Sequence, residues 1–514
     1  MNNNTQSGTY RWLVLGLIMM GTFMAILDIS IVNVALPHMM SEFGVSRNEI
    51  EWVSTAFMIA TAVAMPIVGW LVGRLGHKIL YLSSLSLFTI GSAACAISWS
   101  YDSLIVSRII QAIGGGAIQP VGMAIIAELF EPEERGKAMG IWGTGIMVGP
   151  SIGPTLGGYL TDIFNWRTIF SVNLPVGIIA LVIGLALMEN DRKRLKKDIP
   201  FDWWGFFLLS FALIAGLLAL SKGQEKGWSS TYIVTCISIT IISFTMFLTF
   251  ESVLSQPLLD LKLFLHRNFS ISMGLAIFRS IGLFGGVFLL PIFLENLVGH
   301  TTMQTGLLMM PGAVTIGIMM PIAGRMADKY NTRWLVVTGS ILTGVSLIIY
   351  GNLDPLSGLT MIIGPQFIRG IGLALMMAPL MTAAINAVPM EKVAMAASFL
   401  NVSQRVGGAF GIALLNTFVT DSIKLHAVRL GTTVGTNPES LWQWADLGAK
   451  VTIRNSHSML MSENTKGMAL AAKEILHRAT VLGFENGFFL AGCIILMSLP
   501  LCLLLKDKKK VPAD

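Results

Sequence analysis

Long apolar stretches follow one another from residue 12 to residue 505, and they limit the fold more than any other feature of the sequence. A helix crosses the hydrocarbon core of a bilayer with about 20 mostly apolar residues. The stretches show helical periodicity or none, never the alternation of a barrel strand. They predict an all-α integral membrane protein with fourteen transmembrane helices, at 12–37, 51–72, 79–99, 102–128, 138–161, 168–188, 203–221, 232–251, 268–296, 303–323, 334–351, 357–382, 393–420 and 482–505.

The composition argues against several other classes of protein. Asp, Glu, Lys and Arg make up 12% of the residues, whereas soluble proteins have about 25%. The net charge of +6 comes from short basic runs between the apolar stretches, which is a pattern of membrane orientation and not of nucleic-acid binding. The four cysteines lie within apolar stretches and the seven histidines lie outside the spans or at their edges. No disulfide framework, metal site or cofactor is therefore predicted.

An ATP-driven pump or an enzyme would need residues that the sequence lacks. No nucleotide-binding loop of the form Gly-x-x-x-x-Gly-Lys-Ser/Thr occurs in the chain. No soluble segment is large enough for a nucleotide-binding domain either. We therefore expect a membrane protein without catalytic activity.

The distribution of Lys and Arg predicts the orientation of the chain. With the N-terminus inside, the short inner segments carry 20 of these residues and the short outer loops carry 4. Positive residues favour the cytoplasmic side. Both termini are therefore expected in the cytoplasm, with the chain in the cell (inner) membrane. The basic segment 189–202 is expected to be a solvated run that sets this orientation.

Two pairs of related strings indicate an internal repeat. One pair joins neighbouring spans and consists of Gly69, Arg74, Gly76 and Lys78 in the first copy and Gly324, Asp328 and Arg333 in the second copy. In the other pair, Arg108-Ile-Ile-Gln111 and Gln366-Phe-Ile-Arg369 each precede a proline within a span. We predict a six-helix half at 1–188, a linker with two extra helices at 189–267, and a second six-helix half at 268–514. This plan resembles that of major facilitator transporters, whose substrates bind between the halves.

A motif in the fifth span makes the resemblance specific. The string Gly149-Pro150-Ser-Ile-Gly153-Pro154-Thr-Leu-Gly157-Gly158 resembles the antiporter motif of drug:proton antiporters. Leu27-Asp28 with Asn33-Val-Ala-Leu-Pro37 resembles the signature of the fourteen-span EmrB/QacA type. The resemblance covers nearly the whole chain and implies proton-coupled export of hydrophobic or amphiphilic drugs. EmrB-like subunits also imply a periplasmic membrane-fusion adaptor and an outer-membrane channel as partners.

One position departs from that family. The first gating loop has Gly73 where the family usually has Asp, while the second copy keeps Asp328. The charge relay assigned to that Asp in relatives cannot be placed on the first loop. Arg74 and Lys78 are expected to meet lipid phosphates or a helix C-terminus. Two interpretations stay open, a gate and a basic turn that only sets orientation.

Asp28 and Arg108 are the most informative charges within the spans. A charge at mid-membrane costs roughly 2.5–3.5 kcal/mol on insertion scales, so each one suggests a function. Both residues are predicted at similar depths in spans 1 and 4. We expect Asp28 to take up a proton from outside and release it inside during exchange. A fixed ion pair or a hydrogen bond between helices is the alternative.

Further charges are predicted in the second half. Arg279, Arg369 and Arg405 lie near the middle of their spans, where they would either line the cavity or bind backbone carbonyls at a broken helix. Three cations with few acids favour amphiphilic anions as substrates. Glu295 and Glu485 are closer to span ends and are expected at the interface, although Glu295 is also a candidate cavity charge.

The remaining expectations concern packing, the long loop and the alternatives. Gly149, Gly153, Gly157 and Gly158 would let a neighbouring helix approach, Pro150 and Pro154 would permit bending, and span 5 would seal the contact between the halves. The external loop 421–480, with Trp442, Trp444 and an amphipathic stretch at 467–479, would contact the membrane or an adaptor. Two alternatives to multidrug export remain. One is export of a single compound such as a fatty acid, antibiotic or siderophore, and the other is a transport-inactive sensor.

Overall fold

The computed structural model describes residues 8–189, 200–254, 256–436 and 463–506. Within these ranges all regular structure is helical. Thirteen helical segments are long and apolar enough to cross a membrane, and each overlaps one of the predicted spans. The fold class predicted from the sequence is therefore confirmed. The span without such a segment is the fifth, where α7 (Arg135–Ile163) has 29 residues but eight glycines that lower its hydropathy. A total of fourteen spans stays a prediction.

The helices of the first half run from α1 to α9. They are α1 (Gly8–Phe43), α2 (Arg47–Ile50), α3 (Trp52–Ala64), η2 (Met65–Ile67), α4 (Val68–Leu75), α5 (His77–Ala96), α6 (Tyr101–Leu129), α7 (Arg135–Ile163), α8 (Thr168–Ser171) and α9 (Asn173–Leu187). Two further helices, α10 (Trp203–Lys226) and α11 (Thr231–Val253), pack against each other and form the extra pair.

The second half begins after a short 3-10 segment, η4 (Leu261–Leu265). Its elements are α12 (Arg267–Phe284), η5 (Gly285–Leu289), α13 (Leu290–Phe293), η6 (Leu294–Val298), α14 (Thr302–Lys329), α15 (Thr332–Tyr350), α16 (Leu359–Asn386), η7 (Met390–Lys392), α17 (Val393–Thr436), α19 (Glu463–Leu496) and α20 (Leu499–Leu503). The segments η5 and η6 are π-helical turns within the ninth span, whose helix is continuous over Arg267–Val298.

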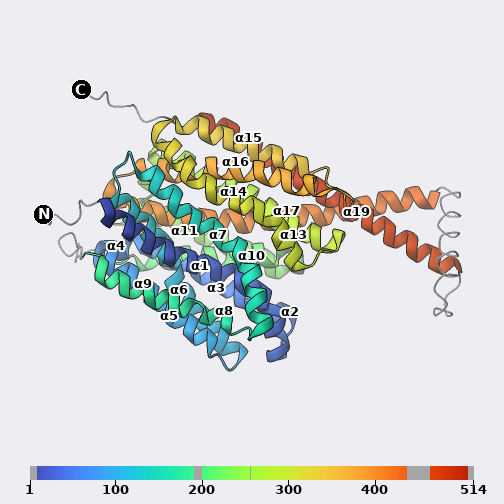
Figure 1. Cartoon of the computed structure of the whole chain (residues 1–514), viewed down its shortest axis with the longest axis horizontal. Coiled ribbons are helices and arrows are strands. Elements are labelled where there is room, and N and C mark those ends of the chain that lie inside the picture. The colour runs from blue at the N-terminus through green and yellow to red at the C-terminus, as the bar shows by residue number, and fades with distance from the viewer. Residues whose placement is uncertain (1–7, 190–199, 255, 437–462, 507–514) are drawn as a thin grey trace.

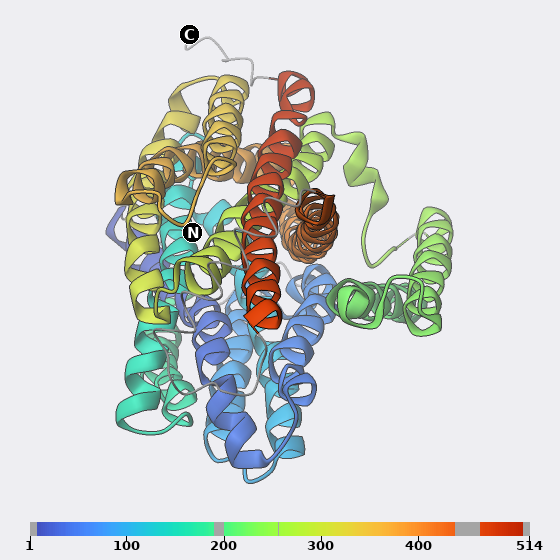
Figure 2. The ribbon, with the colours of Figure 1, turned by 90° about the vertical axis from the view of Figure 1, so that its right-hand side faces the viewer.

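The long helices lie roughly along one axis (Figure 1). Helix α1 begins and α20 ends at the same end of the bundle, which we call the terminal end. In Figure 2 the blue helices of the first half lie below the orange and red helices of the second half, and the extra pair lies at one side in green. The names first half and second half follow the division at residues 188 and 268 that the sequence predicts, and this division stays a prediction.

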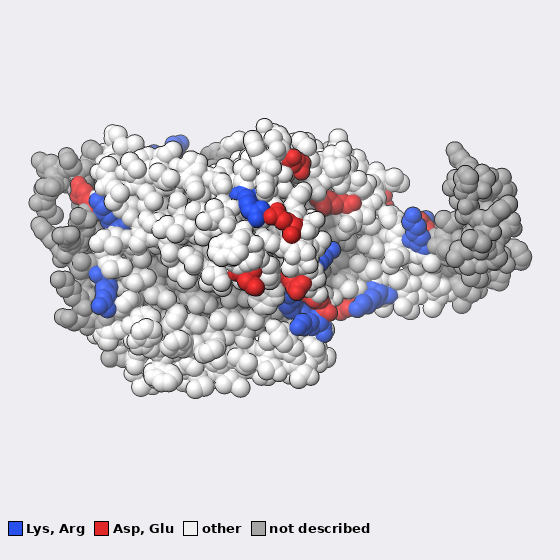
Figure 3. Space-filling model, turned by 90° about the horizontal axis from the view of Figure 1, so that it is seen from below, with Lys and Arg blue, Asp and Glu red and all other residues white. Residues whose placement is uncertain are grey.

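The surface has few charges along the spans. On the face in Figure 3, Lys, Arg, Asp and Glu lie near the terminal end and towards the opposite end, with an uncharged band between them. Exposed side chains on the spans are mostly apolar, as Val182 on α9 and Ile241 and Ile242 on α11 show. An apolar band of this kind fits contact with acyl chains, because a water-facing surface would need more polar groups.

The region predicted as a long loop contains helix. Helix α17 continues to Thr436, and α19 already begins at Glu463, so both extend beyond the bundle at the end opposite the termini (Figure 1). The expectation of a loop over 421–480 is therefore wrong for 421–436 and 463–480. A polar helix outside the membrane needs no apolar stretch, so the hydropathy that located the spans could not detect it. Trp442 and Trp444 lie outside the described residues, as do Arg192, Lys193, Arg194, Lys196 and Lys197 of segment 189–202.

Candidate functional site

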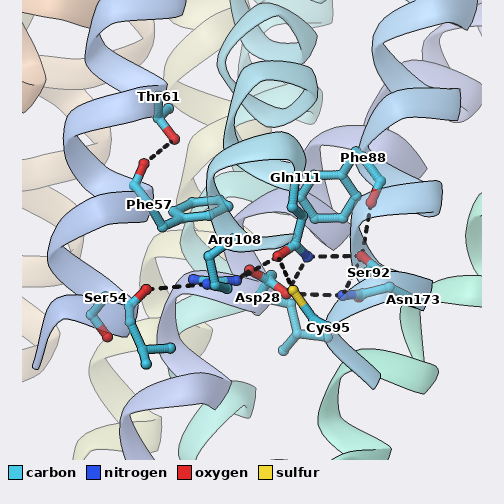
Figure 4. A network of polar contacts seen from close by, with 12 residues as sticks. Asp28, Ser54, Phe57, Thr61, Phe88, Ser92, Cys95, Arg108, Gln111 and Asn173 are labelled. Carbon is cyan, nitrogen blue, oxygen red and sulfur yellow. Dashed lines mark hydrogen bonds and ion pairs between the residues drawn. The ribbon is translucent and has the colours of Figure 1, made fainter. Parts of the chain in front are cut away.

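Asp28 lies in the interior of the first half, in the middle of α1. Its side chain is fully buried, and it does not face the lipid. Apolar residues of α1 surround it in the sequence, so the chain must supply polar partners from other helices. Figure 4 shows these partners, which come from α5, α6 and α9.

Both oxygens of the Asp28 carboxylate accept hydrogen bonds. Arg108 Nη1 on α6 donates to Oδ2 over 2.5 Å and forms an ion pair with it. Gln111 Nε2, one turn further along α6, donates to Oδ1 over 2.8 Å. Asn173 Nδ2 at the start of α9 donates to the same oxygen over 3.0 Å. Asp28 and Arg108, which the sequence places at similar depths, therefore form an ion pair in the structure.

The guanidinium of Arg108 is held on several sides. Its Nη1 also donates to Gln111 Oε1 over 2.7 Å, and its Nε donates to the Val53 carbonyl over 3.2 Å. The rings of Phe57 and Phe170 lie 4.0 and 5.6 Å from its central carbon. Hydrogen bonds and cation–π contacts of this kind stabilise a cation that burial removes from water.

A second layer of polar side chains supports the pair. Gln111 Nε2 donates to Ser92 Oγ over 2.7 Å, and Ser92 in turn donates to the Phe88 carbonyl. The Cys95 thiol donates to Gln111 Oε1 over 3.6 Å. The sequence shows Gln111 in a repeated string, but the sequence alone assigns no role at this site to Gln111, Asn173 or Ser92. The signal for Gln111 was its spacing of three residues from Arg108, which places both on one helix face.

The arrangement can hold a proton or a fixed charge. Protonation of Asp28 would remove one charge of a buried pair and leave Arg108 with Gln111, the Val53 carbonyl and two aromatic rings. All the partners of Asp28 belong to the first half, so the site does not lie on the contact between the halves. In this conformation the carboxylate has no exposed surface through which water could reach it.

Glycines of the antiporter string pack against the segment of α1 that carries Asp28. A Cβ added to Gly149 would lie 3.0 Å from Ile26, and one added to Gly153 would lie 1.9 Å from the Ser30 hydroxyl. One added to Gly157 would lie 2.9 Å from Ile31. These three positions recur every four residues and form one face of α7. Gly158 has open space around it, and Pro150 and Pro154 lie within the helix.

The expectation that span 5 lies on the contact between the halves agrees with the structure, because α7 packs along α14 of the second half. The glycines of α7 lie on two faces. Gly149, Gly153 and Gly157 contact α1 of the same half, whereas Gly136 and Gly140, near the terminal end, meet α14. The sequence motif identified the first of these faces.

The second gating loop closes the terminal end across the two halves. Asp328 Oδ1 and Oδ2 accept hydrogen bonds from the backbone N–H groups of Gly136 and Lys137, each over 2.8 Å. These amides belong to the first turn of α7, where a carboxylate is favoured by unpaired N–H groups and by the helix dipole. A Cβ on Gly324 would lie 2.1 Å from the Gly136 carbonyl, so the two backbones touch. Arg135 Nη1 adds a hydrogen bond to Asn386 Oδ1.

The first gating loop has a different set of contacts. Gly76 joins α4 to α5 with a φ of 80°, which favours glycine. Lys78 Nζ donates to the carbonyls of Leu185 and Met188 at the C-terminus of α9, and a helix C-terminus is one of the two partners expected from the sequence. Arg74 lies over the ring of Trp70. Gly69 approaches Met395 on α17, where an added Cβ would lie 3.1 Å away.

The most buried helices are covered by other helices mainly near the terminal end. Helices α6 and α16 have the most buried spanning windows among the thirteen. From Gly370 to Ile385, α16 is buried except for partial exposure at Ile371 and Ala383. Its other end has Leu359 and Phe367 exposed. The halves therefore meet most closely at the terminal end.

The three arginines predicted near the middle of spans in the second half, Arg279, Arg369 and Arg405, have no hydrogen bond or ion pair with a described residue. Arg279 on α12 and Arg369 on α16 are each only 4% exposed, and Arg405 on α17 is partly buried. The head of Arg369 packs against Gly286, and its Nη1 is buried without a partner. Glu295 in η6 is partly buried and pairs with no described residue. Arg333 of the second gating loop donates to the Leu505 carbonyl over 2.8 Å.

A cavity of about 800 Å³ lies between the extra pair and helices α12 and α17, and none of these charged residues lines it. Its lining carries no charged side chain and includes Phe244, Phe247, Phe399 and Phe410. The charge site and this apolar cavity are therefore separate features.

The sequence and the fold are both similar to those of known transporters. The model of the Major Facilitator Superfamily matches residues 18–412 of the chain. The chain is 32% identical over 494 residues to the uncharacterized MFS-type transporter YhcA of Bacillus subtilis (strain 168), across 96% of this chain and 92% of that protein. It is 30% identical over 461 residues to the multidrug export protein EmrB of Escherichia coli (strain K12), across 89% and 90%. The fold is similar to that of the human organic anion transporter MFSD10, with a TM-score of 0.62 at 13% identity across 97% of this chain and 100% of that chain.

Proposed function

The chain belongs to the Major Facilitator Superfamily, and we propose that it exports hydrophobic or amphiphilic compounds from the cell in exchange for protons. The observation that carries this proposal is the buried Asp28 carboxylate, which is paired with Arg108 and lies on α1 beside the antiporter glycines. The multidrug export proteins among its relatives support the substrate class. No cofactor is part of the proposal.

The proposed cycle couples protonation of Asp28 to the packing of α1. With Asp28 charged, its bonds to Arg108, Gln111 and Asn173 hold α1, α6 and α9 together. A proton on Asp28 weakens the ion pair, and α1 can then move along the smooth glycine face of α7. Each proton that enters supplies about 2.3 kcal/mol per 100 mV of membrane potential, and about 1.4 kcal/mol per pH unit.

The second part of the cycle is the contact at the terminal end. That end is closed here by Asp328, Gly324 and Arg135. Under the proposed orientation, with both termini in the cytoplasm, these contacts open to admit a substrate from the cytoplasm. The chain is placed in the inner membrane, and the extensions of α17 and α19 then project to the outside, where a periplasmic adaptor of an outer-membrane channel would bind.

The test is the substitution Asp28→Asn, assayed in proteoliposomes for substrate binding and for export driven by an imposed pH gradient. We expect binding to persist and uphill export to be lost. Asp102→Asn is the matched control, because Asp102 is an exposed carboxylate in the first turn of α6, and it should export normally.

The Asn variant needs a check on its stability. Breaking a buried pair leaves Arg108 without its counter-ion, at a cost of about 3–5 kcal/mol in comparable cases. The double variant Asp28→Asn with Arg108→Gln removes both charges and should restore the melting temperature without restoring export. Full uphill export by either variant would show that another acid carries the proton.

A further inference from the structure

The two halves share one numbering shift at their charge sites. A shift of 258 residues relates Arg108 to Gln366 and Gln111 to Arg369, the two polar positions of the repeated string. The same shift relates Asp28 to Gly286. Helix α7 starts at Arg135 and α17 starts at Val393, which differ by the same number. The loop strings at Gly69 and Gly324 differ by 255 residues, so the shift of 258 makes Gly286 a candidate counterpart of Asp28, which the contacts test.

The contacts agree with this correspondence. In the first half, Gln111 Nε2 donates to the Asp28 carboxylate over 2.8 Å. In the second half, Arg369 lies directly on Gly286, where an added Cβ would be 1.7 Å from Arg369 Nη1 and 2.4 Å from its central carbon. The positions that meet in one half thus also meet in the other, on α1 and α6 in the first and on η5 and α16 in the second.

The second copy lacks the carboxylate. Arg369 is 4% exposed, and its Nη1 is buried with no hydrogen-bond partner. Gln366 Oε1, one turn away on the same face of α16, is also buried without a partner. In the part of the chain that the structure describes, no Asp or Glu forms an ion pair with Arg369. Burying a guanidinium without a counter-ion costs free energy. An anion bound to Arg369 would recover part of that cost.

We propose that the carboxylate of an amphiphilic anion binds Arg369 in the second half, in the place that the Asp28 carboxylate occupies in the first. This rests on the proposed function and names its substrate class. The planar guanidinium of arginine matches a carboxylate with two parallel hydrogen bonds. Gly286 has no side chain, so the Arg369 guanidinium occupies the place where one would lie, and Gly286 belongs to a π-helical turn, a feature frequent at functional sites. The Arg369 head makes no hydrogen bond to a described residue, so a ligand can draw it away from Gly286 without breaking one.

The experiment measures binding to the purified full-length protein in detergent, without a gradient. The probes are 1-pyrenebutyrate and its methyl ester, which share their shape and differ in charge, followed by energy transfer from the protein's tryptophans. A charge-assisted hydrogen bond changes affinity by about tenfold or more. We therefore expect the acid to bind at least about tenfold more tightly than the ester.

Two variants remove the site in different ways. Arg369→Gln should abolish the preference for the acid while ester binding stays the same. Gly286→Asp supplies an internal carboxylate, because the crowded atom is the flexible end of Arg369, and it should also abolish the preference. Gly286→Ala adds a methyl group without a charge and should keep the preference. Arg279→Gln removes another buried arginine that has no hydrogen bond or ion pair with a described residue, and it should also keep the preference.

The outcomes are distinct. Retention of the preference by folded Arg369→Gln, or its loss in Arg279→Gln alone, would overturn the proposal. Thermal unfolding identifies any variant that fails to fold, and Arg369→Gln tests the site even if Gly286→Asp does not fold. Because binding is measured without a gradient, its failure leaves proton-driven export by the wild type untouched, and failure of the Asp28 test leaves this binding result standing.

Discussion

Asp328→Ala should weaken the contact that holds the two halves together at the terminal end. The Asp328 carboxylate accepts hydrogen bonds from Gly136 and Lys137, each over 2.8 Å, at the first turn of α7. Replacing such a helix cap by alanine costs about 0.5–2 kcal/mol. This contact exists only while the terminal end is closed, so the loss falls on the closed state and not on the open one.

The expected change in the ratio of open to closed molecules follows from that free-energy cost. A loss of about 0.5–2 kcal/mol raises the ratio of open to closed molecules roughly 2- to 30-fold. Asp328→Asn keeps one acceptor oxygen and loses the charge, so it should give a smaller rise. The protein should still fold, because the cap joins two halves that keep the Gly324–Gly136 and Arg135–Asn386 contacts.

The assay is a distance distribution between spin labels at Glu133 and Tyr330, which are exposed positions of the two halves near the terminal end. Asp102→Asn again serves as the control, since Asp102 lies on α6 away from Asp328. We expect the longer distance to gain population in the order wild type, Asp328→Asn, Asp328→Ala. An unchanged distribution in Asp328→Ala would refute the reasoning, because the cap would then contribute nothing to closure.

Three further predictions test other contacts. Gly73→Asp should strengthen closure in the same spin-label assay, because Gly73 stands in the repeat where Asp328 stands and α17 begins near it; a shift towards the open state would contradict this. Gly153→Leu should lower the melting temperature and block export, since its Cβ would lie 1.9 Å from Ser30 Oγ, whereas Gly158→Leu has open space and should do neither. Burial raises the pKa of Asp260, but hydrogen bonds from Lys392 and from the Lys262 backbone outweigh it, so the pKa lies below its usual value. The Asp260–Lys392 ion pair should therefore add up to about 1 kcal/mol to the free energy of unfolding at a pH above the ordinary carboxyl pKa. This stabilisation is lost as the pH falls through the lowered pKa of Asp260. Asp260→Asn should remove this pH dependence from the melting temperature.

Much of the fold could be predicted from the sequence because a bilayer imposes a simple rule. Each apolar stretch of sufficient length predicts a helix, and thirteen of the fourteen predicted spans match such helices. The family was also predictable, because its motifs are local strings, and the relatives named above confirm it. The same rule failed where it does not apply, as at the polar extensions of α17 and α19.

The site could be predicted only in part. Asp28 and Arg108 could be identified from the free-energy cost of placing a charge within an apolar span, because a residue with that cost usually has a function. Their partners Ser92 and Asn173 could not be found in this way, because hydroxyl and amide groups are common in spans and only the packing of α5 and α9 against α1 brings them within reach.

The sequence by itself determined that the chain spans a membrane, that it repeats, and which charges are out of place, because hydropathy and spacing are properties of the chain alone. Only the tertiary structure decided which glycine face meets α1, that Asp328 caps α7 in the other half, and that Arg369 lies on Gly286 with no carboxylate. These facts depend on contacts between segments far apart in the chain, and such contacts are set by the packing of whole helices.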